Sequence, residues 1–323
     1  MILSYFIVFL LLLLMALVYQ RLALRFGIID VPNNRSSHIL PTVRGGGILF
    51  PLAVIFWWMA YDFMNTWMVL GILWIAAISL LDDIYSISRK LRFGVQALGL
   101  TMAFYDLGLF DRESLILIPF LYFVGLGIMN AINFMDGING ITGVYGLVFM
   151  GSLLAINQYM PIFEESLIRY LIISLVVFLI FNMRKKAIMF AGDIGSVSLA
   201  YMIIYFLAQW YLATKDWTII LMLVVYGVDS FVTLTQRILR KENPAIPHRT
   251  HLYQYLVNQC KKDHVIIALL FGLIQFGFNF VFFIYPKSMP SASVGWMILL
   301  VTLGIYLMIK LPIERKFSIS NKY

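Results

Sequence analysis

The sequence has little of what builds a soluble or disulfide-stabilised protein. It contains one cysteine, Cys260, in 323 residues, which excludes an internal disulfide and any cysteine-rich metal centre. Charged residues make up 12% of the chain, about half of the share that is usual in soluble domains. The longest segment without a plausible membrane span is 237–263, which is too short for an independent soluble domain. We therefore expect one membrane domain over residues 1–323.

Apolar residues dominate instead. They make up 62% of the chain, and the mean hydropathy is +0.89. A helix that crosses a bilayer needs about 20 mostly apolar residues. The sequence predicts an all-α polytopic membrane protein with eleven spans, at residues 2–20, 46–61, 66–81, 94–110, 114–134, 140–158, 167–183, 195–213, 217–235, 265–285 and 292–311.

The distribution of basic residues predicts the orientation. The chain has 24 lysines and arginines, and cytoplasmic loops are enriched in them. Twenty of the 24 lie in segments that follow an odd-numbered span. The other four are Arg112, Arg169, Lys215 and Lys287. We therefore expect the N-terminus outside and the C-terminus in the cytoplasm. The net charge of +8 favours anionic headgroups over nucleic acid, because the basic residues are spread over separate membrane-proximal segments.

Two adjacent acids, Asp82 and Asp83, stand at the C-terminal end of the third expected span. The helix dipole disfavours each negative charge there by roughly 0.3–1 kcal/mol. A divalent cation or a basic side chain would relieve the repulsion, and Arg89, Lys90 and Arg92 can form a phosphate-binding face. The alternative is a solvated start of a loop. Function is favoured because carboxylates in membrane proteins tend to be functional.

The segment NAINFMDGING carries the strongest local signal. Asn130, Asn133 and Asp136 share one stripe if the helix extends that far, and Gly137 and Gly140 allow a ligand to approach the backbone. Two amides and a carboxylate suit a hard cation or phosphate oxygens. A polar stripe for helix packing is the alternative, but packing does not require Asp136.

The remaining polar clusters are weaker when each is taken alone. Asp193, in AGDIGS, suits either a metal ligand or a helix N-cap. His248, Arg249 and His251 suit a diphosphate, and zinc is disfavoured because no acidic or cysteine ligand stands beside them at helical spacing. The segment from His38 to the glycines at 45–47 includes Arg44 and predicts an anion cradle built on backbone amides.

Together these motifs resemble the polyprenyl-phosphate N-acetylhexosamine-1-phosphate transferases, which include the MraY enzymes of peptidoglycan synthesis and WecA-type initiators of cell-envelope polysaccharides. The resemblance covers nearly the whole chain. It rests on Asp30, Pro32, His38, Pro41 and the glycines at 45–47, Asp82 and Asp83, Asn130, Asn133, Asp136 and Gly137, Gly192, Asp193, Gly195 and Ser196, Asp229 and Arg237, and Arg249 and His251.

The resemblance implies a reaction at a bacterial cytoplasmic membrane, with the active site facing the cytoplasm. A polyprenyl phosphate such as undecaprenyl phosphate attacks the β-phosphate of a UDP-N-acetyl sugar and releases UMP, with Mg²⁺ as cofactor and Mn²⁺ as a substitute. It implies that Asp193 and Asp136 bind the metal, that Asp82 or Asp83 binds or deprotonates the lipid phosphate, and that His251 contacts the diphosphate.

The resemblance also implies a nucleotide pocket, in which Phe190 stacks on uracil beside Asn182. The family often has an aspartate where this chain has Asn139. A contact with the nucleotide is therefore expected there from an amide instead of a carboxylate. The expected substrate-binding residues are His38, Arg44, Asn130, Asn133, Asn139, Asn182, Phe190, His248 and Arg249.

The run His251-Leu252-Tyr253-Gln254 replaces the histidine cluster of the MraY enzymes. This departure favours the subgroup that initiates O-antigen, lipopolysaccharide or capsule synthesis, some members of which use 6-deoxy sugars. The sequence leaves the sugar and a homodimer open. Three rivals also stay open, namely an ion-coupled transporter that uses Asp106 and Asp229 within the membrane, a CDP-alcohol phosphotransferase, and a scaffold without catalysis. The second is disfavoured because GINGITGVYG lacks the aspartates of that family.

Overall fold

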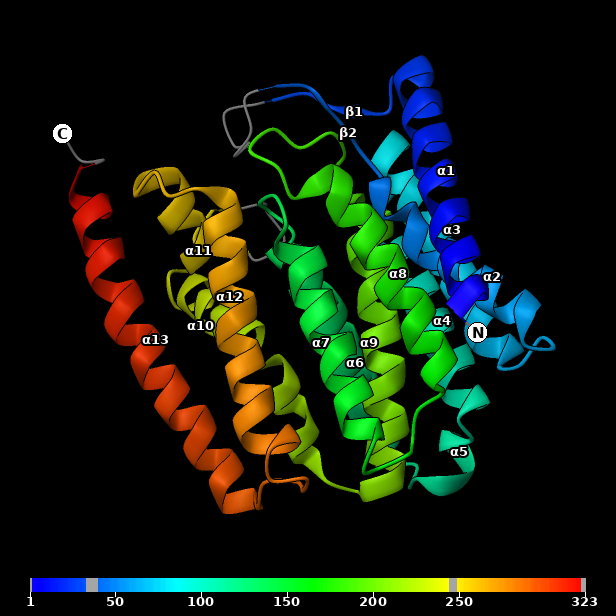
Figure 1. The fold of residues 1–323 in the computed structure, drawn as a ribbon. Helices are drawn as coiled ribbons and strands as arrows, with labels where there is room; N and C mark the ends of the chain where they lie inside the picture. Colours follow the sequence, from blue (N-terminus) through cyan, green and yellow to red (C-terminus); the bar gives the residue numbers. More distant parts are fainter. Residues whose placement is uncertain (1, 33–39, 244–248, 321–323) are drawn as a thin grey trace.

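The computed structural model describes residues 2–32, 40–243 and 249–320, and nearly all of this part of the chain is helical. The helices lie alongside one another in a bundle, with α1 (Ile2–Phe26) at one edge and α13 (Ala292–Ser320) at the other (Figure 1). The elements up to the middle of the chain are β1 (Ile29–Asp30), β2 (Thr42–Val43), η1 (Gly46–Ile48), α2 (Leu49–Ala60), α3 (Thr66–Tyr85), α4 (Arg89–Asp106), α5 (Leu109–Arg112), α6 (Leu117–Met135) and α7 (Ile141–Asn157). The later elements are α8 (Glu165–Asn182), α9 (Gly192–Thr214), η2 (Trp217–Leu223), α10 (Val224–Leu239), α11 (Leu252–Gln254), η3 (Tyr255–Gln259), α12 (His264–Asn279) and η4 (Phe280–Ile284).

The apolar runs of the sequence determine where these helices form. Within the described residues, the helices long and apolar enough to cross a membrane are α1, α3, α6, α8, α9, η2 with α10, α12 with η4, and α13. The helices α7 and η1 with α2 are apolar but shorter. The predicted span 94–110 falls mainly on α4, which begins with Arg89, Lys90 and Arg92 and does not meet this criterion. An all-α polytopic membrane protein is therefore confirmed, whereas the eleven spans and their orientation stay predictions.

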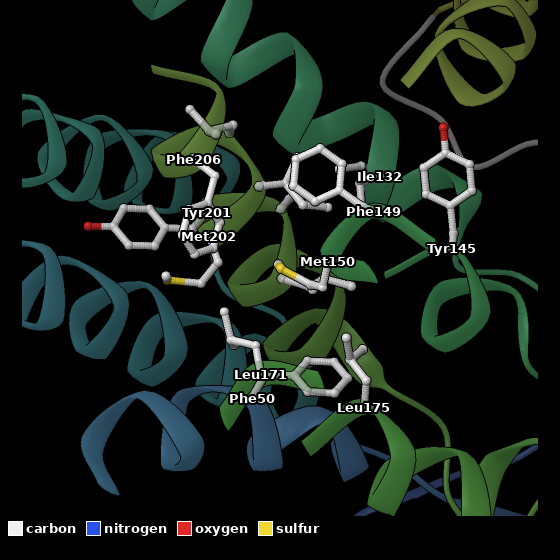
Figure 2. Packing of buried hydrophobic residues seen from close by; sticks show 14 of the residues in the cluster. Phe50, Ile132, Tyr145, Phe149, Met150, Leu171, Leu175, Tyr201, Met202 and Phe206 are labelled. Carbon is white, nitrogen blue, oxygen red and sulfur yellow. The ribbon is translucent and has the colours of Figure 1, made fainter. Parts of the chain in front are cut away.

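The central helix of the bundle is α9, which packs against α3, α6 and α2. Its apolar residues are buried on all sides, as expected for a helix without a polar face. Figure 2 shows Tyr201, Met202 and Phe206 of α9 near Phe149 and Met150 of α7. This tightly packed core fixes the direction in which the N-terminal end of α9 points.

A short hairpin docks on the chain just before α9. Strands β1 and β2 pair antiparallel, and the Phe190 N–H donates to the Val43 carbonyl at 2.8 Å. The Gly46 and Gly47 N–H groups then donate to the carbonyls of Phe190 and Ala191, at 2.7 and 3.0 Å. These two amides are used within the protein, so the predicted anion cradle is wrong in this respect. The glycines instead hold Arg44 against the start of α9.

Gly47 has no side chain, which allows η1 to lie close to the start of α9. A Cβ at Gly47 would lie 2.1 Å from the Gly195 Cα and 2.9 Å from the Ala191 carbonyl oxygen. Gly47→Ala should therefore push η1 away from α9 and destabilise the fold by about 1–3 kcal/mol. Gly151→Ala is the matched control, because nothing lies within 4 Å of its Cβ position. Thermal unfolding in detergent should show a lower midpoint for Gly47→Ala only, and equal midpoints would contradict the close packing.

Candidate active site

Three of the predicted acids meet where α3 ends and α9 begins. The Asp83 side chain is buried, and its two carboxylate oxygens accept the backbone N–H groups of Asp193 and Ile194, at 3.0 and 3.2 Å. Gly192 precedes them with a φ of +71°, and a Cβ at this position would lie 2.5 Å from the Asp83 Oδ2. Asp83 therefore caps the N-terminus of α9, where the helix dipole favours a negative charge. This cap offsets the unfavourable position of Asp83 at the C-terminal end of α3.

Two arginines bind these acids. Arg44 lies 2.8 Å from Asp83, and Arg92 of α4 contacts both Asp82 and, at 3.0 Å, Asp193. Asp82 also accepts the Ile87 N–H at 2.6 Å. The side chains of Arg44 and Arg92 are 38% and 32% exposed, so both can reach an incoming anion as well as their internal partners. The cluster thus brings negative and positive charge together at one end of the bundle.

Asp136 lies close to this cluster. It follows the last residue of α6 and accepts a hydrogen bond from the Thr142 hydroxyl at 2.6 Å. The pKa of Asp136 is raised to about 6, mainly by burial and in smaller part by the nearby Asp193 carboxylate, whereas the Thr142 hydrogen bond and Arg44 oppose the shift. A carboxyl group with a raised pKa is one whose charge is poorly compensated, so a bound cation would stabilise its ionised form.

The predicted amides have mixed surroundings. Asn182 uses both ends of its side chain inside the protein, because it accepts the Gly140 N–H at 2.6 Å and donates to the Met189 carbonyl at 2.8 Å. Asn139 donates to the Arg184 carbonyl at 2.7 Å and is 4% exposed. These contacts join the turn after Asp136 to the segment before α9. They give both amides a structural role in addition to any contact with a nucleotide.

The other predicted site residues differ in their exposure. Asn130 is exposed and donates back to the Leu126 carbonyl at 2.7 Å within α6, and Asn133 is half-buried. Phe190 is half-buried beside β2. His38 and His248 lie outside the described residues.

His251 is nearly buried, at 2% exposure, and contacts an acid that the site prediction did not include. Its Nδ1 lies 2.9 Å from Asp229 of α10, and its ring stacks on Tyr253 with 5.8 Å between centroids. The Tyr253 hydroxyl donates to the Phe134 carbonyl at 2.9 Å, two residues before Asp136. Tyr253 thus connects His251 to the backbone just before Asp136. Half-buried Arg249 lies two residues before it.

Comparisons with known proteins identify the family that this chain resembles. Residues 65–211 match the glycosyl transferase family 4 model. The chain is 26% identical to a probable undecaprenyl-phosphate N-acetylglucosaminyl 1-phosphate transferase of Bacillus subtilis, over 95% of this chain and 89% of that protein. It is 24% identical to the undecaprenyl-phosphate alpha-N-acetylglucosaminyl 1-phosphate transferase of Escherichia coli O157:H7, over 94% and 88%.

The predicted family resemblance is confirmed. A phospho-N-acetylmuramoyl-pentapeptide-transferase of Streptococcus suis is also similar, at 28% identity, but over only 64% of this chain. The family 4 match includes Asp82, Asp83, Asp136 and Asp193, whereas Asp229 and His251 lie beyond its end.

The family resemblance implies a divalent metal, and the chemistry of the acids fits one. Carboxylate oxygens are the ligands that Mg²⁺ prefers. Arg92 contacts Asp193, and Thr142 contacts Asp136. Within the described part of the chain, no three histidine, cysteine, aspartate or glutamate side chains converge closely enough to hold a metal by themselves. Substrate phosphates and water commonly complete the coordination of Mg²⁺, so the residues fit a metal that binds together with its substrate.

Proposed function

We propose that this protein transfers a sugar 1-phosphate from a UDP-N-acetyl sugar to undecaprenyl phosphate and releases UMP. The observation that carries the proposal is the meeting of Asp82, Asp83 and Asp193 with Arg44 and Arg92 where α3 and α9 join. A cluster of carboxylates and guanidinium groups can bind a divalent cation and phosphate groups side by side. The names of the relatives support the undecaprenyl phosphate acceptor.

The reaction requires positioning more than acid–base chemistry. An oxygen of the lipid phosphate attacks the β-phosphorus of the UDP-sugar, the bond to the bridging oxygen breaks, and UMP leaves with the electron pair. The attacking phosphate is mostly ionised near neutral pH, since its second pKa is about 6. Arg44 and Arg92 bind phosphate oxygens, and Asp82 and Asp83 hold these arginines in place. His251 and Arg249 contact the diphosphate.

In this proposal Asp193 and Asp136 would hold Mg²⁺, or Mn²⁺ in its place. When bound, the metal would supply positive charge that stabilises the negative charge on the diphosphate of the UDP-sugar and on the departing UMP. The nucleotide lies toward Phe190, with Asn139 and Asn182 shaping the pocket. Asn130, Asn133, His38 and His248 stay proposed contacts of the substrates.

The placement in the membrane follows from the distribution of charge. We propose eleven spans in a single domain of 323 residues, with the N-terminus outside and the acidic cluster facing the cytoplasm of a bacterial inner membrane. In this orientation the site can meet a soluble nucleotide sugar and the phosphate of a membrane-embedded lipid at one surface. The product would then initiate an O-antigen, capsule or other cell-envelope polysaccharide.

The transporter alternative receives no support. Asp106 accepts hydrogen bonds from Asn65 at 2.7 Å and from Tyr205 at 3.4 Å, so the protein itself stabilises its carboxylate. Asp229 accepts hydrogen bonds from residues of two other segments. The relatives reported above are named as transferases.

Purified protein with polyprenyl phosphate, Mg²⁺ and a UDP-sugar should release UMP, and excess EDTA should stop the release. The sugar panel should begin with N-acetylglucosamine, the sugar named in the relatives, and include N-acetylgalactosamine, N-acetylfucosamine and N-acetylquinovosamine. Restoring Mg²⁺ should restore the activity, which separates metal removal from denaturation. Absence of UMP with every sugar would overturn the proposed function. Activity that EDTA does not change would remove the metal from it.

A further inference from the structure

A buried polar network connects His251 to the C-terminal helix. Its centre is Asp229 of α10, which is completely buried. Three groups donate to its carboxylate, namely the Tyr306 hydroxyl at 2.8 Å, the Thr233 hydroxyl at 3.2 Å and the Leu252 N–H at 3.2 Å, and His251 Nδ1 lies 2.9 Å from it. An ionised carboxylate only accepts hydrogen bonds, and these three donors identify Asp229 as the acceptor at the centre of the network.

Lys310 fixes the direction of the hydrogen bonds in this network. It is also completely buried, and its Nζ donates to the Thr233 hydroxyl at 2.6 Å. An ammonium group cannot accept a hydrogen bond, so the Thr233 oxygen accepts from Lys310 and its proton points to Asp229. The charges of Lys310 and Asp229 balance each other through this hydroxyl.

The hydrogen bond to Asp229 also determines the tautomer of His251. Because the Asp229 carboxylate accepts, Nδ1 of the ring must carry a proton. Contacts of the ring with a ligand then run through Nε2. The ring plane is also held by its stacking on Tyr253, whose hydroxyl is fixed by the Phe134 carbonyl. Gly137 makes room for this hydroxyl, since a Cβ there would lie 2.2 Å from it.

We propose that Asp229 and Tyr306 are positioning residues for His251. Asp229 sets the tautomer and direction of the imidazole, and Tyr306 holds the Asp229 carboxylate in place. The proposal rests on the proposed function for the role of His251 at the diphosphate. It makes α13, which supplies Tyr306 and Lys310, part of the catalytic apparatus, although α13 lies far beyond the family 4 match that ends at residue 211.

The kinetic arm of the test uses the full chain in detergent or nanodiscs. Asp229→Asn leaves one acceptor oxygen and an NH₂ group among several donors, so His251 loses its fixed acceptor, and kcat should fall by about 10–100-fold with little change in KM, as is typical when the partner of a functional histidine is lost. Tyr306→Phe should lower kcat by a smaller factor. Tyr159→Phe is the matched control, because it removes a comparable hydroxyl donor, 2.6 Å from the Phe283 carbonyl, in another part of the bundle. The control should keep its kcat.

The spectroscopic arm does not depend on catalysis. The chain has four histidines, so ¹⁵N-histidine NMR is readable, and His251→Gln assigns the signal. Wild-type His251 should be protonated at Nδ1, and Asp229→Asn should shift it toward protonation at Nε2. If Asp229→Asn does not fold, Tyr306→Phe and Thr233→Val are compared with wild type in its place, with a smaller shift expected.

The two arms separate the two proposals. A wild-type protein without transferase activity would overturn the proposed function, while the ¹⁵N signals would still decide how His251 is held. Active wild type together with unchanged ¹⁵N signals in the variants would overturn the positioning proposal alone. An unchanged kcat in Asp229→Asn would do the same.

Discussion

Asp193→Asn is expected to leave less than about 1% of the wild-type transfer rate, a loss comparable to or larger than the removal of one charge-stabilising group from an active site. The Asp193 side chain is 20% exposed at the N-terminus of α9 and is bound by Arg92 at 3.0 Å. An asparagine oxygen still accepts from Arg92, so the helix should keep its position. What is lost is the negative charge that the proposed metal and the Arg92 side chain require.

Asp216→Asn is the matched control for this substitution. Asp216 also stands at a helix N-terminus, where it accepts the Thr218 N–H at 2.8 Å, but it precedes η2 and follows the C-terminal end of α9, whereas Asp193 lies at the N-terminal end of that helix. UMP release and thermal unfolding should be measured for both variants. Asp216→Asn should keep full activity, and Asp193→Asn should keep the wild-type unfolding midpoint. Wild-type turnover in Asp193→Asn would remove this acid from the mechanism.

The helices could be predicted from the sequence because each apolar run must lie in lipid or in the core. The acids could be predicted because charge is rare in this chain and is costly near a membrane. Asp82, Asp83 and Asp193 are indeed in one cluster. The span at 94–110 was harder to interpret, since α4 begins at Arg89 with several basic residues and one of them, Arg92, joins the site.

The internal partners could not be predicted, because they come from distant parts of the chain. Asp229 and Tyr306 are 77 residues apart, and Asn182 binds the backbone groups of Gly140 and Met189. The sequence shows that Asn182 is polar but not that the fold uses both ends of its side chain. The sequence does carry one signal for Asp229, which is an acid inside an apolar run. That signal fits the family motif and the transporter alternative, and it does not indicate a contact with His251.

Asp83→Asn is expected to have the second large effect, on both activity and stability. The Asp83 side chain accepts two N–H groups of α9 and the Arg44 side chain, whose Nε lies 2.8 Å away. Asparagine has one acceptor oxygen, so its amide group would face a donor. Loss of charged hydrogen bonds at a buried side chain costs about 1.5–3 kcal/mol. We therefore expect folded protein with a lower unfolding midpoint and no measurable UMP release.

Asp82→Asn distinguishes the two neighbouring acids. The Asp82 side chain is more exposed, at 11%, and its partner Arg92 can keep its contact with Asp193. An asparagine at this position can still accept the Ile87 N–H. Asp82→Asn should therefore lower the unfolding midpoint less than Asp83→Asn does, and it should keep some activity because Arg44 and the start of α9 stay in place. The opposite ranking would be an active Asp83→Asn and an inactive Asp82→Asn. It would mean that Asp82 binds the lipid phosphate and that Asp83 only caps α9.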